Sequence, residues 1–304
     1  MTVTLFLEQV LNGLQFGTML FLMAAGLTLV FGVMGLINLA HGSLYMIGAF
    51  AAAAVAAATG NFLIALVGAL AASALAGAIV EIAVLRRLYR RDHLDQVLAT
   101  FALILIFSEG VRWTFGSFPL YLDVPRALAG AVHLGTLSYP LYRLAIIVVG
   151  VAVAIGLYLL TNRTRLGVQI RAGEADREMI AALGIDIARL YTIVFALGAA
   201  LAGLAGALIG PIQSVQVGMG EPVLIMAFVV VVIGGIGSIK GALVGAILVG
   251  LTDTLGRFLL PAILGAFMDP ASAMSIGSAL ASMSIYILMA VILVWKPTGL
   301  MGAR

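Results

Sequence analysis

Long runs of apolar residues alternate with short polar connections along the chain. A helix needs about 20 residues to cross a hydrocarbon core about 30 Å thick, and nine runs are near that length. They cover residues 12–33, 36–57, 62–85, 97–115, 140–161, 191–212, 223–239, 241–260 and 274–295. Glycine-rich polar stretches interrupt the second and seventh runs, which leaves full crossings and broken or re-entrant helices as alternatives. The pattern predicts an all-α, polytopic transmembrane helical bundle of eight to nine spans, forming one domain over residues 1–304.

The composition agrees with a membrane protein. Of the 304 residues, 63% are hydrophobic and only 10% are charged, whereas soluble domains carry about 25% charged residues. A water-soluble globule is therefore excluded. The first residues lack a basic stretch and contain Glu8, so we expect the first span to stay in the protein.

Sites for metals, cofactors, nucleic acid or catalysis are not expected. The chain has no cysteine, and its three histidines are scattered, so no cluster of metal ligands is predicted. The net charge of +3 comes from the connections and does not indicate a nucleic-acid surface. An intramembrane enzyme would need a catalytic set, which His41, Ser43, Glu109 and Asp253 do not form.

Arginines gather in two connections, which indicates that both are cytoplasmic. The first holds Arg86, Arg87, Arg90 and Arg91, and the second holds Arg163, Arg165, Arg171, Arg177 and Arg189. Two spans lie between them, so residues 116–139 are predicted to face outward and the C-terminus to lie inside. The N-terminus lies outside with nine crossings, and inside if residues 36–57 are re-entrant.

A polar stripe interrupts the second apolar run. Asn38, His41 and Tyr45 are three and seven residues apart, and on a helix they share one face. Inside a bilayer such a face must contact protein or a watery cavity, because lipid leaves polar groups unsatisfied. The stripe therefore either lines the route of a solute or hydrogen-bonds to neighbouring helices.

Small residues at four-residue spacing predict close helix packing. The pairs are Gly13 and Gly17, Gly206 and Gly210, and Gly241 and Gly245. Two further spacings, Glu109 with Arg112 and Asp253 with Arg257, allow ion pairs on one helix face.

The block from Gly234 to Leu251 contains a lysine after a glycine run. A phosphate-binding loop needs glycine before the lysine and serine or threonine after it, but Lys240 lies between Ile239 and Gly241. No nucleotide site is predicted in this chain. Ile236, Lys240, Gly241 and Leu243 match Ile37, His41, Gly42 and Leu44 in spacing and rough type, which hints at an internal repeat.

The connection over residues 162–190 is long, charged and prone to form a helix. Five charged residues come before the apolar Met179, Ile180 and Leu183, and Gly184 offers a helix stop. The five are Arg171, Glu174, Asp176, Arg177 and Glu178. We expect an amphipathic cytoplasmic helix at about 171–184 that either inserts into a groove of another protein or lies on the membrane surface.

Three blocks give the sequence a family resemblance over its whole length. They are GLINLAHGSLYMIGA, RAGEADREMIAALGID with the Gly- and Ala-rich span that follows it, and GGIGSIKGALVGA. The sequence resembles LivH-type permease subunits of branched-chain amino acid ABC importers. In such importers a cytoplasmic loop docks into the ATPase through a Glu followed six residues later by Gly, a spacing that Glu178 and Gly184 have. Met179 and Ile180 replace the usual two alanines, and no proline follows.

The resemblance implies a subunit that has no ATPase site of its own and lies in the bacterial inner membrane. Its implied partners are a second permease subunit, two cytoplasmic ATP-binding subunits, an extracytoplasmic solute-binding protein and membrane lipid. The residues implied to couple to the ATPase are Arg171, Glu174, Asp176, Arg177, Glu178 and Gly184. Leucine, isoleucine or valine is the implied solute; amides, urea or aromatic acids, and an ion-gradient-driven transporter, remain alternatives.

Overall fold

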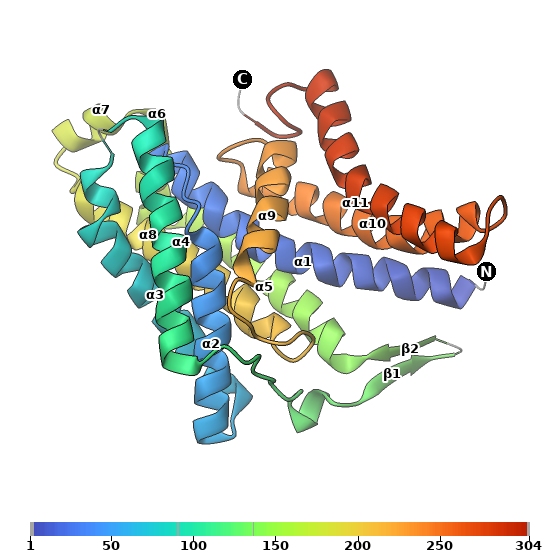
Figure 1. The fold of residues 1–304 in the computed structure, drawn as a ribbon. Helices are drawn as coiled ribbons and strands as arrows, with labels where there is room; N and C mark the ends of the chain where they lie inside the picture. The colour runs from blue at the N-terminus through green and yellow to red at the C-terminus, as the bar shows by residue number, and fades with distance from the viewer. Residues whose placement is uncertain (1–2, 90, 136, 303–304) are drawn as a thin grey trace.

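The computed structural model describes residues 3–89, 91–135 and 137–302, which form a helical bundle with one small β-hairpin (Figure 1). The elements in chain order are α1 (Val3–Met34), α2 (His41–Thr59), α3 (Phe62–Ala83), η1 (Leu85–Arg87), α4 (His93–Phe115), η2 (Arg126–Leu128), β1 (Ala131–Leu134), β2 (Leu137–Pro140), α5 (Leu141–Arg163), α6 (Arg165–Ala175), α7 (Arg177–Ala182), α8 (Ile187–Ile209), α9 (Gly220–Gly234), α10 (Ile239–Leu264) and α11 (Pro270–Trp295). Strands β1 and β2 pair antiparallel. Eight of the helices are long and apolar enough to cross a membrane, which confirms the predicted all-α bundle.

Helix α1 is the centre of the bundle. It packs along α10 on one side and α8 on another, and it also contacts α5 and α9 (Figure 1). The C-terminal half of α1 is almost entirely buried, whereas α4, α5 and α11 expose most of their surface. Most of the surface of these three helices is therefore available to lipid.

Glycines allow the helix backbones to approach closely where α1 crosses its neighbours. A Cβ atom on Gly17 would lie 2.8 Å from the carbonyl oxygen of Ala246 in α10. A Cβ atom on Gly198 in α8 would lie 2.8 Å from the carbonyl oxygen of Gly26 in α1. The predicted close approach at Gly13 and Gly17 is thus confirmed, and these crossings replace the hydrophobic driving force that helices lack in lipid.

The two arginine-rich connections lie at one end of the molecule, as their charge predicts. Figure 1 shows the α3–α4 connection, α6, α7 and the C-terminal segment at that end, and the β-hairpin at the opposite end. We call these the cytoplasmic and outer ends. The ion pairs predicted from spacing are also present, with Arg112 to Glu109 at 2.8 Å and Arg257 to Asp253 at 3.0 Å.

The short helix α9 completes a ninth crossing. Before it, Val215 pairs with Leu120 in the outer connection, with both N···O distances at 2.8 Å. At its other end, the carbonyl oxygens of Ile233 and Gly234 accept hydrogen bonds from the amides of Leu300 and Met301 at the cytoplasmic end. Its 15 residues give a helix about 22 Å long. A hydrocarbon core is about 30 Å thick, so non-helical backbone spans the rest of the membrane.

This arrangement settles the side on which α1 begins. Asn12, near the start of α1, accepts a hydrogen bond of 3.1 Å from the hydroxyl of Tyr139 in β2. The first helix therefore begins at the outer end, and α2 is a full crossing of 19 residues and not a re-entrant loop. The expected run over residues 223–239 is corrected, because the chain leaves the helix at Gly235, where φ is +98°, and α10 begins at Ile239.

The packing also bears on the internal repeat. Helix α3 packs along α8, and α10 packs along α1. By this packing α1 corresponds to α8, and α3 corresponds to α10. The residue match around His41 and Lys240 instead aligns the start of α2 with the start of α10. The residue match therefore pairs α2 with α10, whereas the packing pairs α3 with α10.

The α1–α10 crossing gives a direct test of the packing. We expect Gly17→Val to lower the unfolding free energy by about 1–3 kcal/mol through overpacking, because its side chain meets the α10 backbone. Gly156→Val is the matched control, since a Cβ atom there meets nothing within 4 Å. Thermal unfolding in detergent measures both; equal unfolding midpoints for the two variants would contradict the crossing.

Candidate functional site

The cytoplasmic connection folds as two short helices and not as the single helix expected at about 171–184. The break is at Asp176, whose backbone is extended and whose Oδ1 accepts hydrogen bonds from the amides of Glu178 and Met179, each at 3.0 Å. Asp176 thereby ends α6 and caps α7. Its side chain has a structural task in forming this connection.

Helix α7 is held in place mainly by packing, because six residues are too few for a stable isolated helix. Ile180 points inward and is buried, next to Gly173 of α6 and near Leu190 of α8. After α7, Gly184 adopts a φ of +86°, which favours glycine over any residue with a side chain. The predicted helix stop at Gly184 is therefore confirmed.

The opposite face of α7 is exposed and partly apolar. Met179 is 59% exposed and Leu183 is 73% exposed, and the exposed Glu178 lies beside them. We call Glu178, Met179 and Leu183 the α7 surface. Apolar side chains that project from a charged cytoplasmic connection are typical of a docking surface. The side chain of Arg177 lies outside the described residues.

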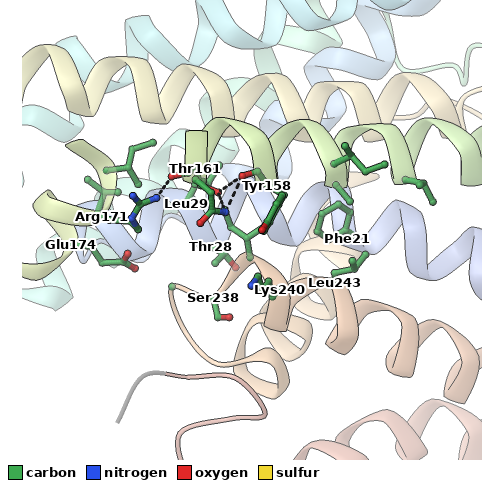
Figure 2. A pocket seen from close by; sticks show the side chains of 18 of the residues that line it. Phe21, Thr28, Leu29, Tyr158, Thr161, Arg171, Glu174, Ser238, Lys240 and Leu243 are labelled. Atoms are coloured by element: carbon green, nitrogen blue, oxygen red, sulfur yellow. Dashed lines mark hydrogen bonds between the residues drawn. The ribbon is translucent and has the colours of Figure 1, made fainter. Parts of the chain in front are cut away.

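Two of the six predicted coupling residues face elsewhere. Arg171 donates a hydrogen bond to the carbonyl oxygen of Thr161 in α5. Glu174 lies against the backbone of Gly32 in α1 and of Gly237 before α10. Both side chains line a cavity of about 550 Å³ beside α6 (Figure 2). The sequence alone could not separate them from the α7 surface, because the bend at Asp176 changes which residues share a face.

The cavity lies between α1, α5, α6 and the start of α10. Its polar residues gather toward α6 and the α10 N-terminus, and its apolar residues continue along the spans (Figure 2). It is lined by Phe21, Thr28, Leu29, Val33, Val151, Ala154, Ile155, Tyr158, Thr161, Asn162, Ile170, Arg171, Glu174, Gly237, Ser238, Ile239, Lys240, Leu243 and Ile247. Burial raises the pKa of the Glu174 carboxyl group above its usual value.

The polar stripe lies in the core and not at this cavity. Helix α2 begins at His41, so Asn38 precedes it in a turn, where its Oδ1 accepts a hydrogen bond of 3.0 Å from the amide of Ala40. The expectation that all three residues share one helix face is corrected for Asn38. His41 and Tyr45 do lie one turn apart on α2, and all three residues are buried.

Several buried polar atoms around this stripe have no hydrogen-bond partner among the described residues. They are Nδ2 of Asn38, Oγ of Ser43 and both ring nitrogens of His41, whose ring lies near the backbone of Met23. Oγ1 of Thr28, which lines the cavity, is a further such atom. Nearby, α2 crosses the start of α9 closely, since a Cβ atom on Gly42 would lie 2.8 Å from the carbonyl oxygen of Gly220. Leaving such atoms dry costs about 1–3 kcal/mol each, which stable folds normally avoid.

A buried carboxylate that we did not predict connects α3 to α8 at the cytoplasmic end. Glu81 is fully buried and pairs with Arg86 at 2.9 Å. It also accepts hydrogen bonds from the hydroxyls of Tyr89 at 2.8 Å and Thr192 at 2.7 Å. We call Glu81, Arg86, Tyr89 and Thr192 the Glu81 cluster. A lone carboxylate in an apolar run, just before an arginine-rich connection, was the signal available in the sequence.

The cluster fixes the start of α8, the helix that follows the α7 surface. Burial and the bond to Glu81 raise the pKa of the Tyr89 hydroxyl well above its usual range, so the hydroxyl remains a donor. The Tyr89 ring also packs edge-on against Tyr191, with centroids 5.0 Å apart. The cluster therefore bonds the start of α8, the helix that follows α7, to α3.

Eight long apolar helices, a short ninth crossing and an exposed pair of cytoplasmic helices define a polytopic membrane protein. The family described as branched-chain amino acid transport system/permease component matches residues 9–294. The chain belongs to this family, whose members are permease components.

Individual relatives cover most of the chain. The high-affinity branched-chain amino acid transport system permease protein BraD of Pseudomonas aeruginosa is 31% identical over 98% of this chain and 96% of BraD. The corresponding protein LivH of Escherichia coli strain K12 is 31% identical over 82% of this chain and 85% of LivH. The probable LivH of Methanocaldococcus jannaschii is 27% identical over 85% and 84%. The chain is accordingly a multi-pass transport permease, of the inner membrane in bacteria.

The Glu81 cluster yields a prediction for stability. We expect Glu81→Ala to lower the unfolding free energy by about 2 kcal/mol, because it removes hydrogen bonds to a charged acceptor while Arg86, which is 39% exposed, regains water. Glu109→Ala breaks an exposed pair and should cost at most about 0.5 kcal/mol. Thermal unfolding of the two purified variants compares them, and an equal loss of stability would contradict the assignment.

Proposed function

We propose that this chain is the membrane-spanning half of an ABC importer for branched-chain amino acids. Separate ATP-binding subunits dock on the α7 surface and drive the bundle between outward-open and inward-open packings. The names of BraD and LivH support the solute class. The single observation that carries the mechanism is the exposure of Met179 and Leu183 on a short, capped helix at the cytoplasmic end.

Docking at this surface follows from the chemistry of its side chains. Burying Met179 or Leu183 in a partner's groove contributes about 1.5–3 kcal/mol each, and Glu178 at the rim selects a groove with a positive edge. Transmission of movement requires a stiff attachment. The buried Ile180 and the Asp176 cap supply it on one side, and the short connection to α8 supplies it on the other.

The proposal assigns the remaining work to other subunits. The chain carries no phosphate-binding loop around Lys240, so ATP hydrolysis belongs to two cytoplasmic ATP-binding subunits. A second permease subunit completes the pathway against the exposed helices, and an extracytoplasmic binding protein delivers the solute at the outer end. The selectivity among amino acids, amides, urea or aromatic acids then lies mainly in that binding protein.

We assign the solute pathway to Asn38, His41 and Tyr45. The burial of all three residues and the unpartnered polar atoms of Asn38 and His41 support this assignment, because a second packing that admits water or solute satisfies those atoms. A protein with only one packing gains nothing from leaving them unpaired. The close glycine crossings of α2 against α8 and α9 are where such a repacking needs the least side-chain rearrangement.

Ion-gradient-driven transport is less consistent with the buried charges. A secondary transporter needs an ionisable group near mid-membrane that is free to bind and release its ion. Glu81 and Asp253, the buried carboxylates among the described residues, each pair with an arginine, at 2.9 and 3.0 Å. Such pairs hold a charge in place, which favours ATP-driven transport.

Coupling at α7 predicts a loss of transport without a loss of folding. In a reconstituted complex, Glu178→Lys and Leu183→Asp should each reduce ATP-dependent leucine uptake at least tenfold, since about 1.4 kcal/mol of docking energy corresponds to tenfold. Gly184→Pro should do the same, because proline cannot adopt the φ of +86° found there.

The matched control for this series is Glu109→Lys. It makes the same charge reversal at an exposed residue near the outer end of α4 and should leave uptake unchanged. Co-purification with the ATP-binding subunits separates the two causes of lost uptake. A variant that no longer co-purifies has lost docking, and one that still co-purifies has lost the transmission of movement. Normal uptake in the three α7-region variants would contradict the docking proposal.

The pathway assignment is tested separately. We expect Asn38→Ala, His41→Ala and Tyr45→Phe to change the rate of leucine uptake or the competition by amides and aromatic acids, while the ATP-binding subunits still co-purify. His133→Ala, at an exposed position in β1, is the control. If all three variants transport like the unmodified protein, these residues are structural.

A further inference from the structure

The cavity beside α6 has a polar end and an apolar end (Figure 2). Arg171 and Lys240 contribute to the polar end, close to where α5 finishes at Arg163 on the cytoplasmic side. The apolar walls continue along α5 as far as Val151 and along α1 as far as Phe21. From Thr161 to Val151 the wall is about 15 Å long, which is half of a hydrocarbon core of about 30 Å.

The two cations have no acidic partner among the described residues. The ammonium group of Lys240 lies over the ring of Tyr158, 5.4 Å from its centroid, and forms none of the ion pairs found in the described part of the chain. Arg171 bonds to a backbone carbonyl and not to a carboxylate. A cation at a membrane surface with no protein counter-charge attracts an anion.

Glu174 is the carboxylate that lines the same cavity. It packs against Gly32 and Gly237, and burial raises its pKa. Even with a full charge on Glu174, Arg171 and Lys240 leave the polar end net positive.

We propose that this cavity binds an anionic phospholipid of the cytoplasmic leaflet, with the phosphate at the polar end that Lys240 and Arg171 line and one acyl chain along α1 and α5. The length of the apolar wall favours a lipid over the transported solute, because the side chain of leucine has only four carbons. The bound lipid would contact α6, α10 and α1 together. It would thereby connect the cytoplasmic helices to the centre of the bundle, whichever solute the protein moves.

The test is lipid retention by the purified complex, measured by native mass spectrometry after exchange into mixed phosphatidylglycerol and phosphatidylcholine. The unmodified complex should retain phosphatidylglycerol preferentially. Lys240→Gln and Arg171→Gln should each weaken retention about fivefold, the effect of one cation at a membrane surface. Lys296→Gln is the matched control, since Lys296 also lies at the cytoplasmic end over an aromatic ring, that of Trp295, but outside the cavity.

A second pair of variants tests the acyl-chain part of the cavity. Ile155→Trp fills the space between α1 and α5 and should abolish retention, whereas Val148→Trp, on an exposed part of α5 outside the cavity, should not. Lys240→Arg keeps the charge and should retain the lipid. If a glutamine variant fails to fold, Lys240→Arg and the lipid preference of the unmodified complex still test whether the cavity binds an anionic lipid.

Three results would overturn the proposal. Equal retention of the two lipids would remove the role of charge. Complete competition by excess inorganic phosphate, with Ile155→Trp unaffected, would leave an anion site without an acyl chain. Displacement of the lipid by leucine would assign the cavity to the solute pathway, and the uptake assays above would remain as the separate test of transport.

Discussion

The structure depends on how closely helix backbones approach one another inside lipid. Apolar side chains gain little by leaving lipid for each other, so association relies on tight packing of small residues. Helix α1 provides it twice, at Gly17 against α10 and at Gly26 against α8. The cytoplasmic connection rests on the same framework, because Glu174 packs against Gly32 near the end of α1 and Ile180 of α7 packs against Gly173 of α6.

The sequence predicted the features that the bilayer itself imposes. Membrane thickness fixes span length, and the asymmetry of arginine fixes sidedness, so the bundle and its cytoplasmic end follow from composition and order. The remaining features depend on contacts between distant residues. The break at Asp176 depends on a local capping bond that competes with a continuous helix, and the position of Asn38 depends on where α2 begins. The partners of Glu81 include Thr192, more than a hundred positions away, which no local pattern reveals.

The two parts of the proposed mechanism are separated within the fold. The α7 surface lies outside the membrane-spanning helices, whereas Asn38, His41 and Tyr45 are enclosed between α1, α8 and α9. Helix α8 joins them, since it begins just after α7 and crosses both α1 and α2 through glycines. The candidate site was therefore predictable as two motifs, but only the structure identifies the element that connects them.

The hydrogen bond between Thr192 and Glu81 has a consequence for which helices would move when the ATP-binding subunits move α7. Because Thr192 in the second turn of α8 is bonded to Glu81 of α3, a displacement at α7 would be shared by both helices. On the preceding side, α6 follows α5 after a single extended residue, Thr164, and Arg171 of α6 donates a hydrogen bond to the carbonyl oxygen of Thr161 in α5. A displacement at α7 would therefore reach two spans at once, α3 through the start of α8 and α5 through α6.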